Sequence, residues 1–153
     1  MPMIDVTYPE GALAPDARAN LIEDLTTSLL RAERAPDTEF FRNITWVYVH
    51  ELPEGSVLAA GKPVAEPTFR IEVTTPEGAL SDRRRKEMVE SATAAVLEAS
   101  GLSPEDSIRV WVVMREIDEG SWGAAGQVVQ FKQLVEAAKQ EREKAAEPVA
   151  AGS

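Results

Sequence analysis

The sequence is poor in the side chains on which most catalytic and metal sites depend. It has no cysteine and a single histidine in 153 residues, which excludes disulfide scaffolds, thiolate or histidine-cluster metal sites and cysteine nucleophiles. Cations are also scarce, with 16 Lys+Arg against 26 Asp+Glu and a net charge of −10. Nucleic acids and anionic membranes bind surfaces rich in Lys and Arg, so neither is an expected partner. The expected partners are a small-molecule substrate and other protein chains.

Long apolar runs and the residue pattern of a leader sequence are also missing. No apolar stretch approaches the roughly 20 residues that span a bilayer, and the first residues lack a basic segment followed by an apolar one. The hydrophobic fraction of 44% is too high for a disordered chain, and 153 residues most simply form one domain. We therefore expect a folded, cytoplasmic protein.

A tandem repeat is the clearest feature that the sequence does have. Residues 7–13 read TYPEGAL and residues 74–80 read TTPEGAL, so six of seven positions match at an offset of 67. Residues 51–61 read ELPEGSVLAAG and residues 116–126 read EIDEGSWGAAG, with seven of eleven positions identical at an offset of 65. Two matches in the same order predict a duplicated unit.

Both copies, at 2–62 and 68–127, are predicted to fold as strand, helix, strand and glycine-containing turn. Apolar residues alternate in the expected strands and recur every three or four residues in the expected helices. Ser81 is a suitable N-cap for the second helix, and Gly101 is suited to follow its last turn. The expected strands are 3–8, 44–50, 69–74 and 108–114, and the expected helices are 15–33 and 82–100.

A strand–helix–strand unit of this size forms a right-handed crossover between parallel strands. Two units therefore predict an α+β fold, with a four-stranded sheet and two helices on one face. The other face carries Trp46, Tyr48 and Trp111 without cover from the same chain, which favours an oligomer. We expect residues 1–131 to form a single domain, and residues 132–153 to add a C-terminal helix and a frayed tail, EPVAAGS.

The one unusual base in the sequence is Pro2. No G-x-S-x-G or phosphate-binding loop is present. A small residue such as proline at position 2 permits removal of Met1, and Pro2 would then carry a secondary amine, whereas every internal proline nitrogen is an amide. An α-amino group titrates near neutrality, and burial lowers its pKa further. Pro2 is therefore the candidate general base.

These features resemble the tautomerase superfamily. The resemblance rests on the PMIDV start, the repeated PEGAL turns and the GSWGAAG segment, and covers residues 2 to about 131. The tandem form is similar to fused members such as cis-3-chloroacrylic acid dehalogenase and malonate semialdehyde decarboxylase. The resemblance implies a tautomerase-like or MIF-like fold, a homotrimer, no cofactor and no metal. It also implies that the amino-terminal proline acts as general base in tautomerases or general acid in dehalogenases.

Few of the family's other functional residues are found at the matching positions. Trp46 and Trp111 stand where the tautomerases have an arginine on the second strand, and Trp122 matches the aromatic wall of their active site. The positions of the dehalogenase's histidine, arginine pair, tyrosine and glutamate fall on or near residues of other types, namely Leu29, Pro76, Ala79, Val113 and Ala124. Because hydrolytic dehalogenation needs an activated water and cationic anchors at these positions, the sequence favours a tautomerase.

A 2-oxo acid substrate requires a cationic anchor and a partner for its enolate oxygen. Arg70, on the strand that mirrors the Pro2 strand, is the first choice of anchor. Arg115 and Arg109 are the second choices and Arg42 the third, while Tyr48 is a candidate hydrogen-bond donor to the enolate.

The sequence thus predicts a cofactor-independent keto–enol isomerase that acts on a 2-oxo acid or enol, with an arylpyruvate-like enol as one form. The alternatives are a dehalogenase, hydratase or decarboxylase of the same superfamily, and a catalytically inactive trimeric binding protein.

Overall fold

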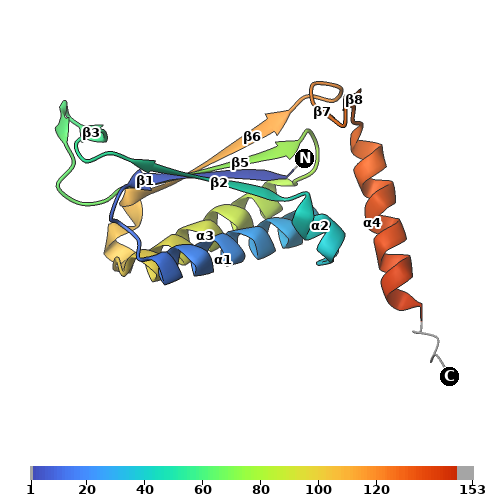
Figure 1. Ribbon diagram of the computed structural model, residues 1–153, viewed down its shortest axis with the longest axis horizontal. Coiled ribbons are helices and arrows are strands. Elements are labelled where there is room, and N and C mark those ends of the chain that lie inside the picture. Colours follow the sequence, from blue (N-terminus) through green and yellow to red (C-terminus); the bar gives the residue numbers. More distant parts are fainter. Residues whose placement is uncertain (1, 148–153) are drawn as a thin grey trace.

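The computed structural model describes residues 2–147, and its elements follow the repeat (Figure 1). The first unit comprises β1 (Met3–Pro9), α1 (Pro15–Glu33), α2 (Glu39–Asn43), β2 (Trp46–Leu52), β3 (Leu58–Ala59) and β4 (Lys62–Pro63). The second unit comprises β5 (Phe69–Pro76), α3 (Asp82–Ser100), the 3₁₀ helix η1 (Pro104–Arg109), β6 (Val110–Ile117), β7 (Gly123–Ala124) and β8 (Gln127–Val128). The chain continues as α4 (Phe131–Ala146). All but the first residue of the EPVAAGS tail lies outside the described residues.

The four long strands form one mixed sheet in the order β2-β1-β5-β6. β1 pairs with β2 and β5 pairs with β6 in parallel, whereas β1 and β5 are antiparallel at the centre. Helices α1 and α3 lie side by side on one face of this sheet (Figure 1). The structure thus confirms the predicted α+β fold with two parallel strand–helix–strand units. That residues 1–131 form a single domain stays a prediction.

The core lies between the sheet and the two long helices because each element presents one apolar face. Buried and partly exposed side chains alternate along β1, and buried side chains alternate with more exposed ones in the first half of β5. The apolar stripes of α1 and α3 pack onto the buried side chains. Both helices have the predicted bounds. Ser81 caps α3, with its hydroxyl accepting the Arg84 amide at 3.4 Å, and Gly101 follows with a positive φ of 70°.

Two strands begin two residues later than the sequence predicts. β2 begins at Trp46 because the short helix α2, which Thr38 caps, occupies the preceding residues. β6 begins at Val110 because η1, with a capping box made by Ser103 and Asp106, occupies the segment before it. In both places a short helical segment occupies the residues before the strand, so the strand starts where that segment ends.

Each unit ends in a two-stranded hairpin with the same turn. Ala60 and Gly61 connect β3 to β4 with φ of 51° and 76°, and Ala125 and Gly126 connect β7 to β8 with φ of 52° and 75°. Two consecutive positive φ angles are the signature of a type I′ turn, which matches the twist of a hairpin. The repeated AAG sequence therefore specifies this turn in both units.

The sheet face opposite α1 and α3 is uncovered, as the sequence predicts. Trp46, Tyr48 and Trp111 are 57%, 46% and 67% exposed. The same face carries charged groups between these aromatic side chains, including His50 and Asp5, whose Nε2 and Oδ1 atoms are 2.6 Å apart. A face with three exposed aromatic rings is unusual for a monomer and is typical of an interface.

Helix α4 leaves the sheet after the β7–β8 hairpin and runs beside α2 (Figure 1). Its first amide, at Phe131, donates to the Glu119 carboxylate at 3.0 Å. In its second turn Ala138 packs against Leu30 of α1 and Phe41 of α2, so the helix is attached at the end of the sheet where β1 begins. Among residues 2–147, no helix combines the length and apolar character that crossing a bilayer requires.

Candidate active site

Pro2 lies buried directly before β1, and its carbonyl accepts a hydrogen bond from the Trp46 amide at 3.3 Å. Because α1 connects two parallel strands, it runs back along them and ends beside the start of β1. Pro2 therefore meets the last turn of α1, the short helix α2 and the inner side of α4. Together these elements enclose a cavity of about 170 Å³, lined by Pro2, Glu33, Arg34, Ala35, Phe41, Phe131, Leu134, Val135, Ala138 and Arg142.

Glu33 is the acidic group of this cavity. Its Oε1 atom is buried, and no donor in the described part of the chain contacts it. Burial raises the pKa of the Glu33 carboxyl to about 7, and the nearby Arg84 guanidinium opposes part of this rise. Arg84 is fixed there because its Nη1 donates to the Ala32 carbonyl at 2.8 Å. The cavity thus contains a carboxyl group that titrates near neutral pH.

Two exposed arginines line the same cavity. Arg34 ends α1 in the left-handed region, with φ of 57°. Arg142, on α4, donates a guanidinium hydrogen bond to the Arg34 carbonyl. The cavity thus combines two guanidinium groups, which can bind a carboxylate, with apolar side chains from α4.

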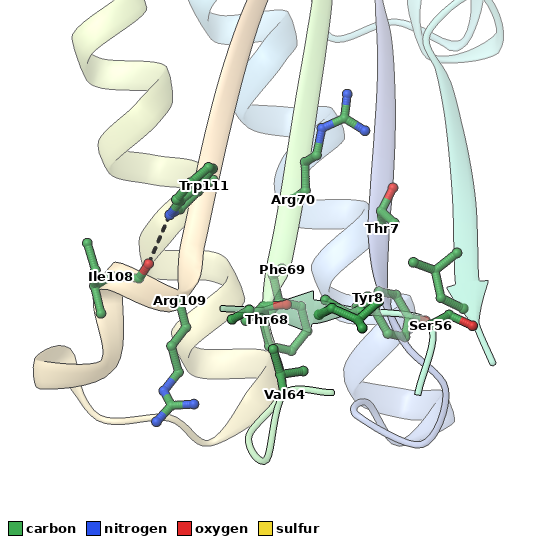
Figure 2. A pocket seen from close by; sticks show the side chains of 14 residues that line it. Thr7, Tyr8, Ser56, Val64, Thr68, Phe69, Arg70, Ile108, Arg109 and Trp111 are labelled. Atoms are coloured by element: carbon green, nitrogen blue, oxygen red, sulfur yellow. Dashed lines mark hydrogen bonds between the residues drawn. The ribbon is translucent and has the colours of Figure 1, made fainter. Parts of the chain in front are cut away.

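A second, larger cavity lies at the opposite end of the central strands. It has a volume of about 660 Å³ and borders the start of β5, where the repeat places Phe69 in the position of Pro2. Figure 2 shows its side chains, with the rings of Tyr8 and Phe69 side by side at a centroid distance of 5.8 Å. In the same view Arg70 and Arg109 point away from each other, so their guanidinium groups do not converge on one anion.

Two of the predicted anchors, Arg70 and Arg115, lie at different ends of the sheet. Arg70 pairs with Thr7 and lines the second cavity. Arg115 pairs with Thr74, which in turn pairs with Met3, so Arg115 lies at the end of the sheet where Pro2 is found. Both guanidinium groups contact Glu72, Arg115 with Nε at 2.9 Å from its Oε1. Within one chain, each of these arginines therefore already has a carboxylate partner.

The predicted aromatic side chains are not among the residues that line the Pro2 cavity in the described part of the chain, although the Trp46 amide bonds to Pro2. Trp46 and Tyr48 are neighbours on the uncovered face, with ring centroids 6.4 Å apart, and Trp111 lies on the same face beside the second cavity. Trp122 precedes β7, and its carbonyl accepts the Val129 amide at 3.1 Å. Of the seven residues predicted for the site, Pro2 is the one that lines the smaller cavity in the described part of the chain.

The sequence did not identify Glu33 or Arg34 as site residues, and it predicted no chemical role for the segment that forms α4. A usable signal was present for the first two. Once a parallel strand–helix–strand unit is predicted, the helix must end beside the start of its first strand, so residues 33–35 had to lie near Pro2. No comparable pattern reveals where α4 docks, because that depends on contacts between distant segments.

The second unit matches a known family. Residues 70–132 match the family model of the tautomerase enzymes. No curated protein sequence matches the chain. In sequence, the similarity to this family therefore lies in the second unit.

Solved structures share the whole fold. A member of the cis-3-chloroacrylic acid dehalogenase family, N1, is 24% identical, with a TM-score of 0.71 over 95% of this chain and 92% of that one. Pt0534 inactivated by 2-oxo-3-pentynoate is 22% identical, with a TM-score of 0.70 over 86% and 98%. A symmetric trimer of a fused 4-OT is 20% identical, with a TM-score of 0.68 over 84% and 94%. The two-unit chain has the fold of the superfamily's fused members, which confirms the resemblance found in the sequence.

Proposed function

We propose that this protein is a cofactor-independent tautomerase in which Pro2, exposed as a secondary amine by removal of Met1, acts as the general base. The observation that carries the proposal is the position of Pro2. It lies buried at the start of β1 and lines a small, mostly apolar cavity together with a carboxyl group and two arginines. Proton abstraction next to a carbonyl needs a base near neutral pH, exclusion of water and stabilisation of the developing enolate.

The proposed reaction moves one proton within a 2-oxo acid. The Pro2 nitrogen accepts a proton from the carbon next to the ketone, and the electrons of that C–H bond form the carbon–carbon double bond of the enolate. The ammonium of Pro2 then gives the proton to the enolate oxygen, which regenerates the free amine. The reverse direction, from enol to ketone, uses the same two steps, so the residue needs to exchange only one proton per cycle.

Arg34 and Arg142 are the proposed anchors for the substrate carboxylate in place of Arg70. Both line the Pro2 cavity, and guanidinium groups suit a planar carboxylate. The apolar wall made by Phe41, Phe131 and Leu134 suits an alkyl or arylpyruvate-like side chain. Since the cavity is only about 170 Å³, an aromatic substrate would extend past its mouth.

A homotrimer is the proposed assembly. The uncovered sheet face has three exposed aromatic side chains, and a fused 4-OT with the same fold is a symmetric trimer. In a trimer the predicted residues Trp46, Tyr48, Trp111 and Arg115 would face a neighbouring copy. Sedimentation velocity tests this assembly. A monomer at micromolar concentration would refute it.

The test of the proposed reaction is the ketonisation of phenylenolpyruvate, followed by ultraviolet absorbance. Intact-mass measurement first establishes whether Met1 has been removed, because retained Met1 would leave Pro2 with an amide nitrogen. The Pro2→Ala variant should be slower than the native protein by about 100- to 10,000-fold. Pro63→Ala, in the exposed β3–β4 hairpin, is the matched control and should keep the native rate. Equal rates for Pro2→Ala and the native protein would refute the role of Pro2.

A further inference from the structure

Glu33 differs from the other acidic groups of the folded core. Glu51 and Glu72 each contact at least one arginine, whereas the buried Oε1 of Glu33 has no donor among residues 2–147. An unpaired buried carboxyl oxygen is costly and is uncommon in a folded protein without a functional reason. Glu33 lines the same cavity of about 170 Å³ as Pro2, so the pyrrolidine nitrogen is the obvious group to complete its contacts.

The other charged groups around this cavity do not change their charge near neutral pH. Arg34 comes from the end of α1, Arg142 from α4, and Arg84 reaches the end of α1 from α3. The short helix α2 contributes Phe41, which is apolar. Guanidinium groups stay protonated throughout the neutral range. Among residues 2–147, the groups at this cavity that titrate near neutrality are the Glu33 carboxyl and the amine that Pro2 gains when Met1 is removed.

We infer that Glu33 is a positioning residue that shares one proton with the Pro2 nitrogen and so sets the acidity of the catalytic amine. The inference rests on the proposed function, because it requires Pro2 to be an amine. In one form the carboxylate lies beside the Pro2 ammonium, and in the other the neutral carboxyl lies beside the free amine. Each charge favours the opposite charge on its partner, so the pair holds a single proton over a range of pH.

Such sharing suits a keto–enol isomerase. The amine must be free before it abstracts the proton and protonated afterwards, so neither form can be much more stable than the other. A buried amine alone would strongly favour its neutral form, because burial disfavours the ammonium. The Glu33 carboxylate offsets that preference. It stabilises the ammonium in the second step without touching the substrate.

The experiment measures the acidity of Pro2 by a reaction that does not require the natural substrate. The probe is 2-oxo-3-pentynoate, an electrophilic ynone. The free Pro2 amine adds to its alkyne, forming a nitrogen–carbon bond while one π bond breaks and the amine proton moves to the adjacent carbon. The labelling rate is measured by intact mass from pH 5 to 10, and peptide mapping establishes the modified residue.

Native protein is compared with Glu33→Gln, Glu33→Asp and the control Glu98→Gln. Glu98 is an exposed glutamate near the end of α3, the equivalent helix of the second unit. Removing the carboxylate should move the acidic limb of the labelling profile to lower pH by about one to three units, because the ammonium loses its neighbouring charge. Glu33→Asp should stay close to the native profile, and Glu98→Gln should reproduce it.

A second measurement uses the native sequence and covers the case in which Glu33→Gln does not fold. The titration of the Glu33 side-chain carboxyl carbon is followed by NMR before and after Pro2 is labelled. Because labelling removes the positive charge of the amine, the Glu33 titration should move to higher pH.

An unchanged labelling profile in Glu33→Gln, or an unchanged Glu33 titration after labelling, would overturn the inference and leave the proposed function intact. If Pro2 is not labelled in the native protein at any pH, the proposed function fails, and the inference fails with it.

Discussion

The two ends of the central strand pair are related by the repeat, but they differ in what surrounds the first residue of each unit. At one end Pro2 directly precedes β1 and lines a cavity of about 170 Å³ under α4. At the other end Phe69 begins β5, and the cavity of about 660 Å³ beside it has no helix equivalent to α4 among its lining residues. The hairpin of the first unit leads directly into β5, whereas that of the second unit leads into α4. The duplicated fold thus provides two equivalent places, and α4 covers only the one beside Pro2 in the described part of the chain.

The carboxylates at the two ends show the same contrast. Glu51, beside the second cavity, accepts the Tyr8 hydroxyl at 3.0 Å and the Arg18 guanidinium at 2.7 Å. Glu33, beside Pro2, has a buried oxygen that no donor in the described chain satisfies. A paired carboxylate is a structural element, whereas an unpaired buried one costs stability that function must justify.

Replacing Pro2 should reduce activity, whereas replacing Phe69, its equivalent in the second unit, should reduce stability. Pro2→Ala is expected to reduce phenylenolpyruvate ketonisation by about 100- to 10,000-fold with a small change in stability. Phe69, which is 2% exposed, packs in the core, so Phe69→Ala should lower the free energy of unfolding by about 3 to 5 kcal/mol. Urea denaturation and the rate assay are run on both variants. The comparison fails if Phe69→Ala, at a temperature where it is folded, loses as much activity as Pro2→Ala.

Glu33 should make the protein less stable as pH rises. Its pKa is raised from 4.5 to about 7 in the folded state, so the folded protein binds the extra proton between these values. The Glu33 contribution is therefore lost between about pH 4.5 and 7, by up to about 3 kcal/mol. Glu33→Gln should be more stable than native protein at pH 8 and similar at pH 4. Denaturant melts across this range measure the difference.

The control for this variant is Glu98→Gln, whose stability difference from native protein should not depend on pH. A constant difference for Glu33→Gln as well would show that the Glu33 carboxyl is ionised in both states, contrary to its burial.

Separating α4 from the body should affect the Pro2 end alone. Ala138 is 8% exposed against Leu30 and Phe41, and Ala138→Glu places a charge in that contact. Because the helix can undock instead of burying the charge, the cost should be limited to about 1 to 3 kcal/mol. The Michaelis constant should rise as the cavity opens, and hydrogen exchange in α4 should become faster. Ala145→Glu, on the exposed side of the same helix, is the control. Unaltered exchange in α4 would contradict the docked position.

The repeat made most of the fold predictable, since matching turns fixed the two units and periodicity gave both long helices their bounds. The starts of β2 and β6 were missed because Thr38 and Ser103 cap short helical segments that no repeat marks. Pro2 could be selected because its amine chemistry depends on chain position alone. Arg70 was selected as anchor by analogy between strands, but β5 runs antiparallel to β1, so equivalent positions in the two units lie at opposite ends of the sheet. Glu33 could have been found from the direction of α1, whereas the docking of α4 needed the three-dimensional structure.

The smallest expected effect is at the paired carboxylate of the second end. Arg18 and Glu51 are 43% and 38% exposed in their side chains, so water screens the attraction between them. Arg18→Met keeps much of the aliphatic stem while removing the charge, and should lower stability only slightly at low salt. The difference from native protein should shrink in 0.5 M salt, which screens exposed charges to within about 4 Å. Activity should not change, because neither residue lines the Pro2 cavity. A loss of activity at native stability would mean that the second end contributes to the reaction, and the division between a structural and a catalytic end would have to be abandoned.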